Sequence, residues 1–334
     1  MPIRVAVVGA GSWGTTVASL ACVNTPTVLW ARRKVLAEQI TSEHCNGDYL
    51  PTFSLPEELT ATHSMADAVS GADVVVMGVP SHGFRSVLEE AAPFVRPWVP
   101  VVSLSKGLER GTLLRMSEVV GQVLPGHPGA VLTGPNLARE IMDGQPAASV
   151  VATTDAVIGR ELQRIFTSDH LRVYTNHDLI GCEIAGVVKN VLAIASGMAD
   201  GMGFGDNTRA TLVTRGLHEL ARLGQALGGE ALTFAGLAGM GDLIATCSST
   251  QSRNHMVVVQ LGKGRPINEI LSEMNMVAEG VKSSPSVLEL AKRHGVDMPL
   301  SEAVVAVCHR GRPAREVVRR LMEREAGAEM AGLR

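Results

Sequence analysis

A single lysine lies in the middle of a segment that is otherwise almost entirely apolar. The segment covers residues 183–194, and Lys189 is its central cation. Apolar residues on all sides of such a helix predict that the helix is buried. Burial of an ammonium is costly unless it is neutralised or paired, and desolvation lowers an ammonium pKa towards the range in which an amine acts as a general acid or base. Lys189 is therefore a candidate catalytic group; alternatively, its stem lies on the core and its head reaches water.

Three further polar residues are candidate partners of this lysine or of a substrate. Asn190 follows it directly and could orient either one. Asp242 and Thr246 are four residues apart, so a helix places them on one face. Asp242 is a natural partner for an ammonium; the alternative is that its carboxylate caps a helix that begins after glycines.

A short polar run before a predicted helix suits the binding of a phosphate. Ser252, Arg253 and Asn254 would present a hydroxyl, a guanidinium, an amide and free helix N–H groups together. The alternative is that Asn254 caps its helix and Arg253 forms a surface ion pair. Further along, Glu279 either begins a helix as an ordinary acidic residue or contacts a cofactor.

Small-residue loops follow several predicted strands, where ligands of an open α/β sheet bind. Lys106 lies between Ser105 and Gly107 and could reach a ligand oxygen, although an ordinary surface lysine would look the same. A second such loop contains Gly134 and Asn136.

Near the N-terminus, a buried strand runs into the pattern Gly-x-Gly-x-x-Gly. Gly9 permits the tight turn, Gly11 lets a pyrophosphate approach the backbone, and Gly14 lets helix and strand pack closely. The N–H groups at the start of the helix near Ser12 would hold the phosphates. We interpret this segment as a dinucleotide-binding turn.

The end of the second strand indicates which dinucleotide is bound. It carries Arg32 and Arg33, with no acidic residue to bind ribose hydroxyls. A cationic pair suits a 2′-phosphate, which favours NADP(H) and leaves NAD(H) as a second cofactor. The alternative is a solvated basic start of a helix.

The elements that must position these residues fall into two groups. Short apolar runs at 3–8, 27–30, 73–79, 100–103, 130–133, 149–152 and 171–174 alternate with helical patterns, which predicts a Rossmann-type, doubly wound parallel sheet covered on both faces. After about residue 182 only helical patterns remain. We therefore expect a dinucleotide-binding domain over residues 1–181 and an all-α substrate-binding domain over residues 182–334.

Composition narrows the function further. The net charge of −3 argues against nucleic acid as a partner. Five scattered cysteines and ten histidines without ligand spacing indicate no metal site and suit a reducing cytoplasm. With neither a basic leader nor 18 unbroken apolar residues, we expect no membrane insertion.

Several of these motifs, in this order, are together typical of one family. They are Gly9–Thr15, Val79–Ser81, Ser105–Gly107, Gly134–Glu140, Glu183–Asn190, Gly203–Thr208, Gly239–Leu243 and Ser252–Asn254. The chain resembles NAD(P)-dependent glycerol-3-phosphate dehydrogenase of the bacterial biosynthetic type over nearly its whole length. Many members carry Ser or Thr where this chain has Asn136. The resemblance therefore does not predict the geometry of a substrate contact at this position.

The resemblance implies reversible reduction of dihydroxyacetone phosphate to sn-glycerol 3-phosphate for phospholipid synthesis, in a cytoplasmic enzyme that is commonly a homodimer. It implies that Lys189 is the proton donor and that Lys106 contacts substrate and cofactor. Substrate contacts fall on Gly134, Asn136, Asp242, Ser252, Arg253 and Asn254, and cofactor contacts on Ser12, Trp13, Arg32, Arg33, Ala138, Arg253, Val277 and Glu279. The alternatives are a β-hydroxyacid or 6-phosphogluconate type dehydrogenase, or an NAD(P)-binding sensor without catalysis.

Overall fold

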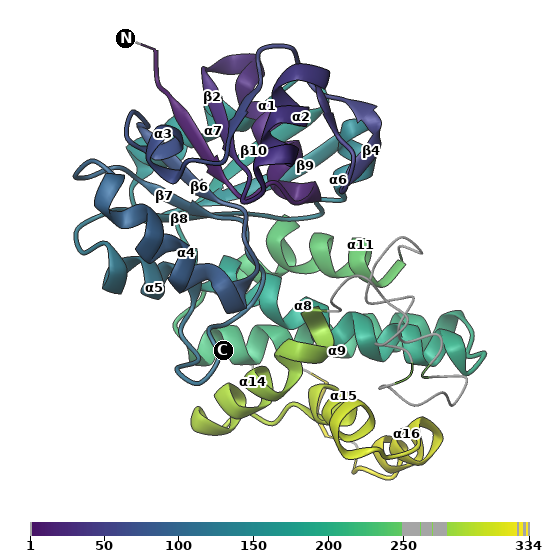
Figure 1. The fold of residues 1–334 in the computed structure, drawn as a ribbon. Helices are drawn as coiled ribbons and strands as arrows, with labels where there is room; N and C mark the ends of the chain where they lie inside the picture. The colour runs from purple at the N-terminus through teal and green to yellow at the C-terminus, as the bar shows by residue number, and fades with distance from the viewer. Residues whose placement is uncertain are drawn as a thin grey trace. The chain divides into compact units, whose positions relative to one another are not determined.

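The computed structural model describes residues 2–248 and 279–325, together with positions 261, 269, 327–329 and 332. The chain forms two compact units, Met1–Leu179 and Ile180–Arg334 (Figure 1). Each unit has its own architecture. Four predicted site residues lie outside the described residues: Ser252, Arg253, Asn254 and Val277.

The first unit is built on one eight-stranded sheet with the order β10-β9-β8-β7-β6-β1-β2-β5. In chain order its strands are β1 (Val5–Val8), β2 (Thr27–Trp30), β5 (Thr60–Thr62), β6 (Val74–Met77), β7 (Val101–Ser103), β8 (Gly129–Thr133), β9 (Ala147–Ala152) and β10 (Leu171–Asn176). All neighbours are parallel except β8 and β9. The predicted strands are thus confirmed, and the sheet is parallel-dominated.

The orientation of β9 differs from the fully parallel sheet that the sequence predicts. The link from β8 to β9 contains one five-residue helix, α6 (Ala138–Met142). A parallel connection must bring the chain back along the length of the sheet, usually on a helix of about three turns. At about 1.5 Å per residue, α6 is too short to do so. The chain therefore re-enters the sheet at the end where β8 leaves it, so β9 runs antiparallel to β8.

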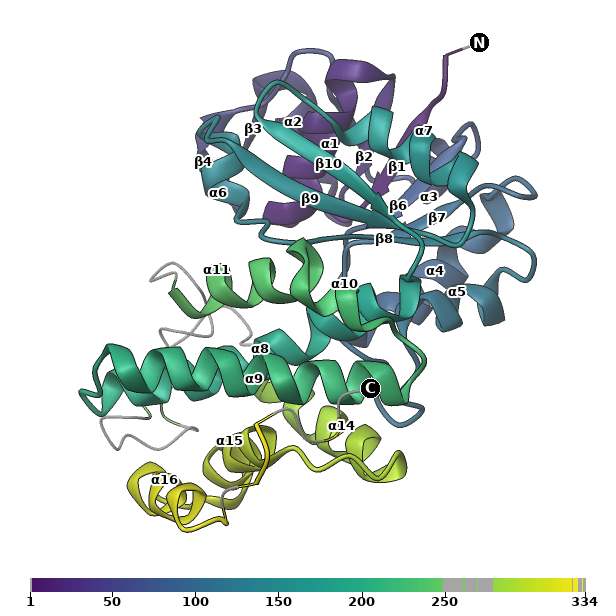
Figure 2. The same cartoon turned by 180° about the vertical axis from the view of Figure 1, so that it is seen from behind.

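Helices cover both faces of this sheet, as a doubly wound fold requires (Figures 1 and 2). Val5 and Val7 of β1 pack in one core cluster with side chains of α1 (Ser12–Asn24), α2 (Lys34–Glu43) and α7 (Ala156–Phe166). Ala6 and Val8 point to the opposite face and pack with α3 (Met65–Val69), α4 (Phe84–Ala91) and α5 (Met116–Val123). Alternate residues of one apolar strand therefore serve two cores.

Three short strands were not predicted. β5 extends the sheet beyond β2, and β3 (Cys45–Asn46) pairs with β4 (Leu50–Ser54) in a separate antiparallel ribbon. Short 3₁₀ turns flank α4 at Ser81–Gly83 (η1) and Ala92–Phe94 (η2). The strands β3 and β5 have two and three residues, which is too few for an alternating pattern to stand out in the sequence.

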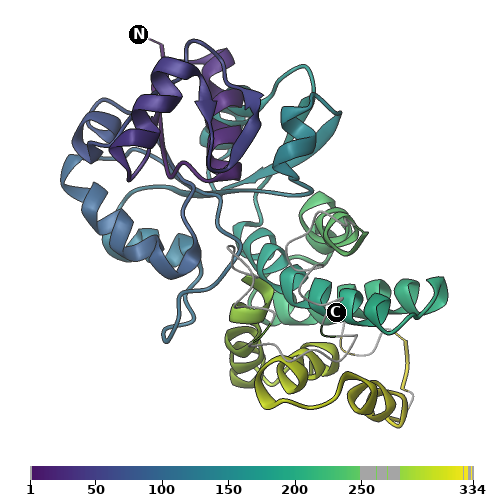
Figure 3. The ribbon, with the colours of Figure 1, turned by 45° about the vertical axis from the view of Figure 1, so that its right-hand side comes forward.

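The described part of the second unit is helical, as predicted (Figure 3). Its helices are α8 (Leu179–Gly201), α9 (Asp206–Ala226), α10 (Ala231–Ala235), a π-helical turn η3 (Leu237–Gly241), α11 (Asp242–Ser248), α14 (Glu279–Arg293), α15 (Pro299–Arg310) and α16 (Ala314–Met322). The segment 237–248 is divided at Asp242 into a π-helical turn and an α-helix.

Helix α8 forms the core of this unit. It begins at Leu179, four residues before the predicted start, and every residue from Gly181 to Ala199 is buried. A window of this helix with mean hydropathy 1.6 is long and apolar enough to cross a membrane, yet 89% of that window is buried inside the structure. Its apolar circumference is therefore explained by packing against the helices around it.

Candidate active site

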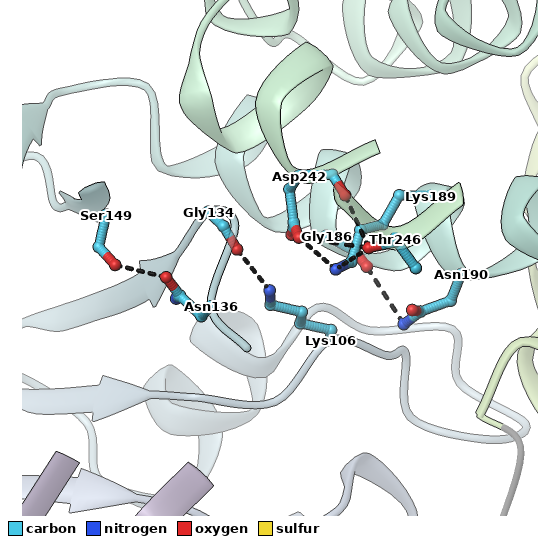
Figure 4. A network of polar contacts seen from close by, with 9 residues as sticks. All are labelled: Lys106, Gly134, Asn136, Ser149, Gly186, Lys189, Asn190, Asp242 and Thr246. Carbon is cyan, nitrogen blue, oxygen red and sulfur yellow. Dashed lines mark hydrogen bonds and ion pairs between the residues drawn. The ribbon is translucent and has the colours of Figure 1, made fainter. Parts of the chain in front are cut away.

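The central feature of the second unit is an ion pair buried around Lys189. Its side chain lies on α8, and the residue is 5% exposed. Its Nζ donates a hydrogen bond to Oδ1 of Asp242 and a second, 2.9 Å long, to Oγ1 of Thr246 (Figure 4). Asp242 is itself 1% exposed. The structure therefore brings together three residues that the sequence marked as candidates, and the Lys189 side chain is only 7% exposed.

Helix α11 presents the two partners on one face. Thr246 Oγ1 donates to the backbone oxygen of Asp242 at 2.6 Å, one turn earlier, which orients the hydroxyl towards Lys189. The helix starts at Asp242 directly after the π-helical turn, in which Gly241 N donates to Gly236 O at 3.1 Å. A Cβ on Gly239 would lie 2.2 Å from Phe234 O, so only glycine fits there. The glycines thus shape the turn that aims the Asp242 carboxylate.

The surroundings of this pair are dry. Cys247 follows Thr246 on α11, and burial raises the pKa of its thiol to about 12. Surroundings that disfavour a thiolate at Cys247 also solvate a carboxylate poorly. The Asp242 carboxylate and the Lys189 ammonium therefore each depend on the other to compensate their charge. The raised pKa also leaves Cys247 as an unreactive thiol.

Helix α14 packs against α8 beside the lysine. A Cβ on Gly280 would lie 2.2 Å from the backbone oxygen of Asn190, so the helix start touches the α8 backbone there. Asn190 is 6% exposed, and its Nδ2 donates to Gly186 O at 3.4 Å. Glu279 is the first residue of α14 and so lies next in the chain to this contact.

In the first unit, the loop after β8 gathers a second set of predicted residues (Figure 4). Lys106 Nζ donates to the backbone oxygen of Gly134 at 2.9 Å. Gly134 has a φ of +123°, which side chains rarely adopt. Asn136 Oδ1 accepts a hydrogen bond from Ser149 Oγ on β9. The amide Nδ2 of Asn136 and the hydroxyl of Thr133 are buried without a hydrogen-bond partner.

The sequence does not predict a role for Ser149. This residue is fully buried, and it approaches this loop because β9 runs antiparallel to β8. A parallel β9 would have placed its first residues at the opposite end of the strands, beside the start of β8. No signal in the sequence pointed to Ser149, since a serine within an apolar strand is ordinary.

The turn between β1 and α1 has the geometry of a phosphate cradle. Gly9 has a φ of +119°, and a Cβ on it would lie 2.6 Å from Gly78 O. A Cβ on Gly14 would lie 2.0 Å from Gly9 O, whereas a Cβ on Gly11 would meet no atom within 4 Å. The first and third glycines are therefore needed for packing, and the second leaves open space before the N-terminus of α1. These residues fit a dinucleotide pyrophosphate.

Two residues at the start of α1 also occur among the predicted cofactor contacts. Ser12 Oγ donates to Tyr49 O at 3.2 Å. The indole Nε1 of Trp13 is buried without a hydrogen-bond partner. Ala138 begins α6, close in the chain to Asn136.

The basic pair after β2 is exposed. Arg33 forms an ion pair with Asp48, and both side chains are largely in water. Within the described part of the chain, Arg32 has neither an ion-pair nor a hydrogen-bond partner. A guanidinium at the carboxyl end of the second strand that is held by no acid fits a 2′-phosphate.

Comparison with known proteins agrees with this geometry. Family models described as NAD-dependent glycerol-3-phosphate dehydrogenase N-terminus and C-terminus match residues 4–158 and 178–319. The chain is 58% identical over 329 residues to glycerol-3-phosphate dehydrogenase [NAD(P)+] 2 of Sphingopyxis alaskensis, covering 98% of this chain and 99% of that one. It is 49% identical to the Mycobacterium avium glycerol-3-phosphate dehydrogenase [NAD(P)+], covering 98% and 97%.

A solved structure extends the likeness to three dimensions. The crystal structure of glycerol-3-phosphate dehydrogenase from Coxiella burnetii matches with a TM-score of 0.91 and 36% identity, covering 97% of this chain and 99% of that one. Both units are matched, which favours this family over the two alternatives left open by the sequence. The chain belongs to the NAD-dependent glycerol-3-phosphate dehydrogenase family.

Proposed function

We propose that this chain reduces dihydroxyacetone phosphate to sn-glycerol 3-phosphate, reversibly and with NADPH or NADH, and that Lys189 donates the proton. The chain is an oxidoreductase whose relatives are named glycerol-3-phosphate dehydrogenase [NAD(P)+]. The observation that carries the role of Lys189 is its burial together with Asp242 and Thr246. A charged pair in a dry core costs several kcal/mol per ion, so its retention needs a functional reason.

The reaction follows from the charge that develops on the ketone oxygen. A nicotinamide held in the first unit would supply the hydride that the carbonyl carbon accepts. Lys189 stabilises the negative charge on the oxygen and transfers a proton from Nζ to it, which completes the alcohol. Asp242 holds the ammonium charged before the transfer, and Thr246 fixes its direction. Water then returns a proton to the amine.

The cofactor is held by residues that fit it. Gly9, Gly11 and Gly14 form the pyrophosphate turn. Ser12, Trp13, Ala138, Arg253, Val277 and Glu279 are further proposed contacts. Arg32 and Arg33 support a preference for NADP(H) over NAD(H), because two exposed guanidinium groups at this position would bind a 2′-phosphate.

The substrate is held by its phosphate and by its reacting end. Arg253, Asn254 and Ser252 are proposed to bind the phosphate, which orients the ketone through a group that does not react. Lys106, Gly134, Asn136 and Asn190 are the other proposed contacts. We further propose that the protein is a cytoplasmic homodimer that supplies glycerophospholipid synthesis.

A spectrophotometric assay tests the proposal. NADPH, and then NADH, is mixed with dihydroxyacetone phosphate, and oxidation of the cofactor is followed by the loss of its near-ultraviolet absorbance. We expect activity with both cofactors, higher with NADPH, and none with hydroxy acids in the reverse direction. Inactivity with the phosphorylated ketone would contradict the assignment.

A second assay tests the phosphate site. Unphosphorylated dihydroxyacetone should react far more slowly than its phosphate, and Arg253→Ala should raise the KM for the phosphate ester steeply. Arg293→Ala is the matched control, since Arg293 forms an exposed ion pair with Glu289 on α14. Equal reactivity of the two ketones in the wild type would remove the phosphate site from the proposal.

A further inference from the structure

The contact between Ser149 and Asn136 has a consequence for substrate binding. Asn136 carries one acceptor and two donor hydrogens on its amide, and only the acceptor, Oδ1, is used within the protein. The donor Nδ2 is buried and has no partner. A buried donor without an acceptor is unfavourable, so an acceptor from outside the protein is a physical reason for its presence.

The Ser149 hydroxyl determines which atom of the Asn136 amide, Oδ1 or Nδ2, has no partner within the described protein. With Oδ1 facing Ser149, the hydroxyl donates and is satisfied. A hydroxyl can also accept, so an amide rotated by half a turn would donate from Nδ2 to Ser149 and leave Oδ1 without this bond. In the orientation that the structure has, the Ser149 hydroxyl proton has an acceptor, and Nδ2 is the amide atom left for a ligand.

The sheet fixes Ser149 in this place. The register pairs Thr133 of β8 with Val150 of β9, so the next pair along brings Ser149 to Gly134. A Cβ on Gly134 would lie 3.3 Å from Ser149 Cα, so the absence of a side chain there allows the two backbones to approach. Because Ser149 is fully buried in a strand paired on both sides, its hydroxyl is a rigid anchor.

We propose that Ser149 is a positioning residue for the reaction: it holds the Asn136 amide so that Nδ2 donates to an acceptor oxygen of the phosphorylated ketone. This inference rests on the proposed function. Lys106, on the loop after β7, reaches the loop after β8 through its hydrogen bond to Gly134 O, so an ammonium and an amide donor lie at neighbouring loops, as an anionic, oxygen-rich substrate would require. Ser149 thus supplies the support that holds the Asn136 amide in this direction.

A double-mutant cycle tests the proposal in the full-length protein. Ser149→Ala should raise the KM for dihydroxyacetone phosphate by about tenfold, the size expected for one hydrogen bond, while kcat and the Kd for NADPH stay within about twofold. Asn136→Ala should raise the same KM at least as much. The double variant should be no worse than Asn136→Ala, because Ser149 acts only through Asn136.

A control separates positioning from stability. Thr153 is a buried hydroxyl directly after β9, and its Oγ1 donates to Gly129 O at 3.0 Å, at the opposite end of the same strand pair. Thr153→Ala should lower the unfolding temperature about as much as Ser149→Ala and leave the KM unchanged. If Ser149→Ala is insoluble, Ser149→Cys, a weaker donor of similar size, serves in the same cycle.

Two results would overturn the inference: an unchanged KM in Ser149→Ala, or an effect of Ser149→Ala that persists in full when Asn136 is already alanine. Both are measured against an active wild-type enzyme. Failure of the proposed function would appear differently, as inactivity of the wild type with this ketone.

Discussion

Replacing Lys189 by methionine would test both its chemistry and its role in the core. The variant leaves the Asp242 carboxylate, 1% exposed, without its ammonium partner. Removing one partner of a buried pair costs about 3–5 kcal/mol, because an uncompensated charge remains. For a domain of this size that corresponds to a fall in unfolding temperature of roughly 10 °C. Loss of the general acid should lower kcat by about 10²–10⁴-fold.

The single variant cannot separate these two effects, but a second change can. In Lys189→Met/Asp242→Leu, both charges are replaced by apolar side chains of similar volume. Such replacements are neutral or stabilise by about 1–4 kcal/mol, so the unfolding temperature should return to the wild-type value or exceed it. The turnover number should remain as low as in the single variant, because no proton donor has been restored.

The assay is oxidation of NADPH at saturating dihydroxyacetone phosphate, combined with thermal unfolding of the same samples. Quenching of protein fluorescence by NADPH checks that the first unit still binds cofactor in every variant. If the double variant recovers both stability and turnover, then Lys189 has a structural role only and another group must donate the proton.

Three further predictions concern other parts of the molecule. Replacing Arg32 and Arg33 by glutamine should raise the Kd for NADPH at least tenfold and leave that for NADH nearly unchanged; equal weakening would contradict a 2′-phosphate site. Burial raises the pKa of Glu219, which accepts hydrogen bonds from the start of α15, from its ordinary value of 4.5 to about 7. The folded state therefore holds this proton more tightly than the unfolded state. The stabilisation of the folded state by this proton is fully present below pH 4.5 and is lost as the pH rises through 7, by about 3 kcal/mol in total. Glu219→Gln should flatten the dependence of the unfolding temperature on pH. Gly280→Ala should destabilise the second unit, since the added methyl would lie 2.2 Å from Asn190 O, and an unchanged unfolding temperature would show that α14 can shift freely.

Much of this architecture could be predicted because the sequence signals are local. A four-residue apolar strand followed by three spaced glycines specifies the β1–α1 turn with little influence from the rest of the chain. The burial of α8 was predictable for the same reason, since its apolar residues leave no polar face. The four-residue spacing of Asp242 and Thr246 is enough by itself to place both side chains on one face of a helix.

The remaining features depend on contacts between distant parts of the chain. Spacing along α11 cannot tell which cation its polar face will meet, and Lys189 is 53 residues away. The direction of β9 depends on the length of α6, a five-residue helix that carries almost no periodic signal. Alternating strands and helices usually form a parallel sheet, so the sequence predicted a parallel β9. A parallel β9 would not bring Ser149 close to Asn136, so this contact was not predicted.

The unsatisfied polar atoms of the first unit indicate where a ligand would contribute most. Among the described residues of this unit, buried side-chain atoms without partners occur on Trp13, Thr133 and Asn136 and, away from the glycine turn, on His44. The first three follow or end strands at the edge where an open α/β sheet binds its ligands. Each lost hydrogen bond costs about 1–3 kcal/mol in the free protein, and a folded chain tolerates such a cost most readily where binding recovers it. Under the proposed function, cofactor and substrate would complete the polar network at this end of the sheet, and Ser149 would determine the direction in which the Asn136 amide meets the substrate.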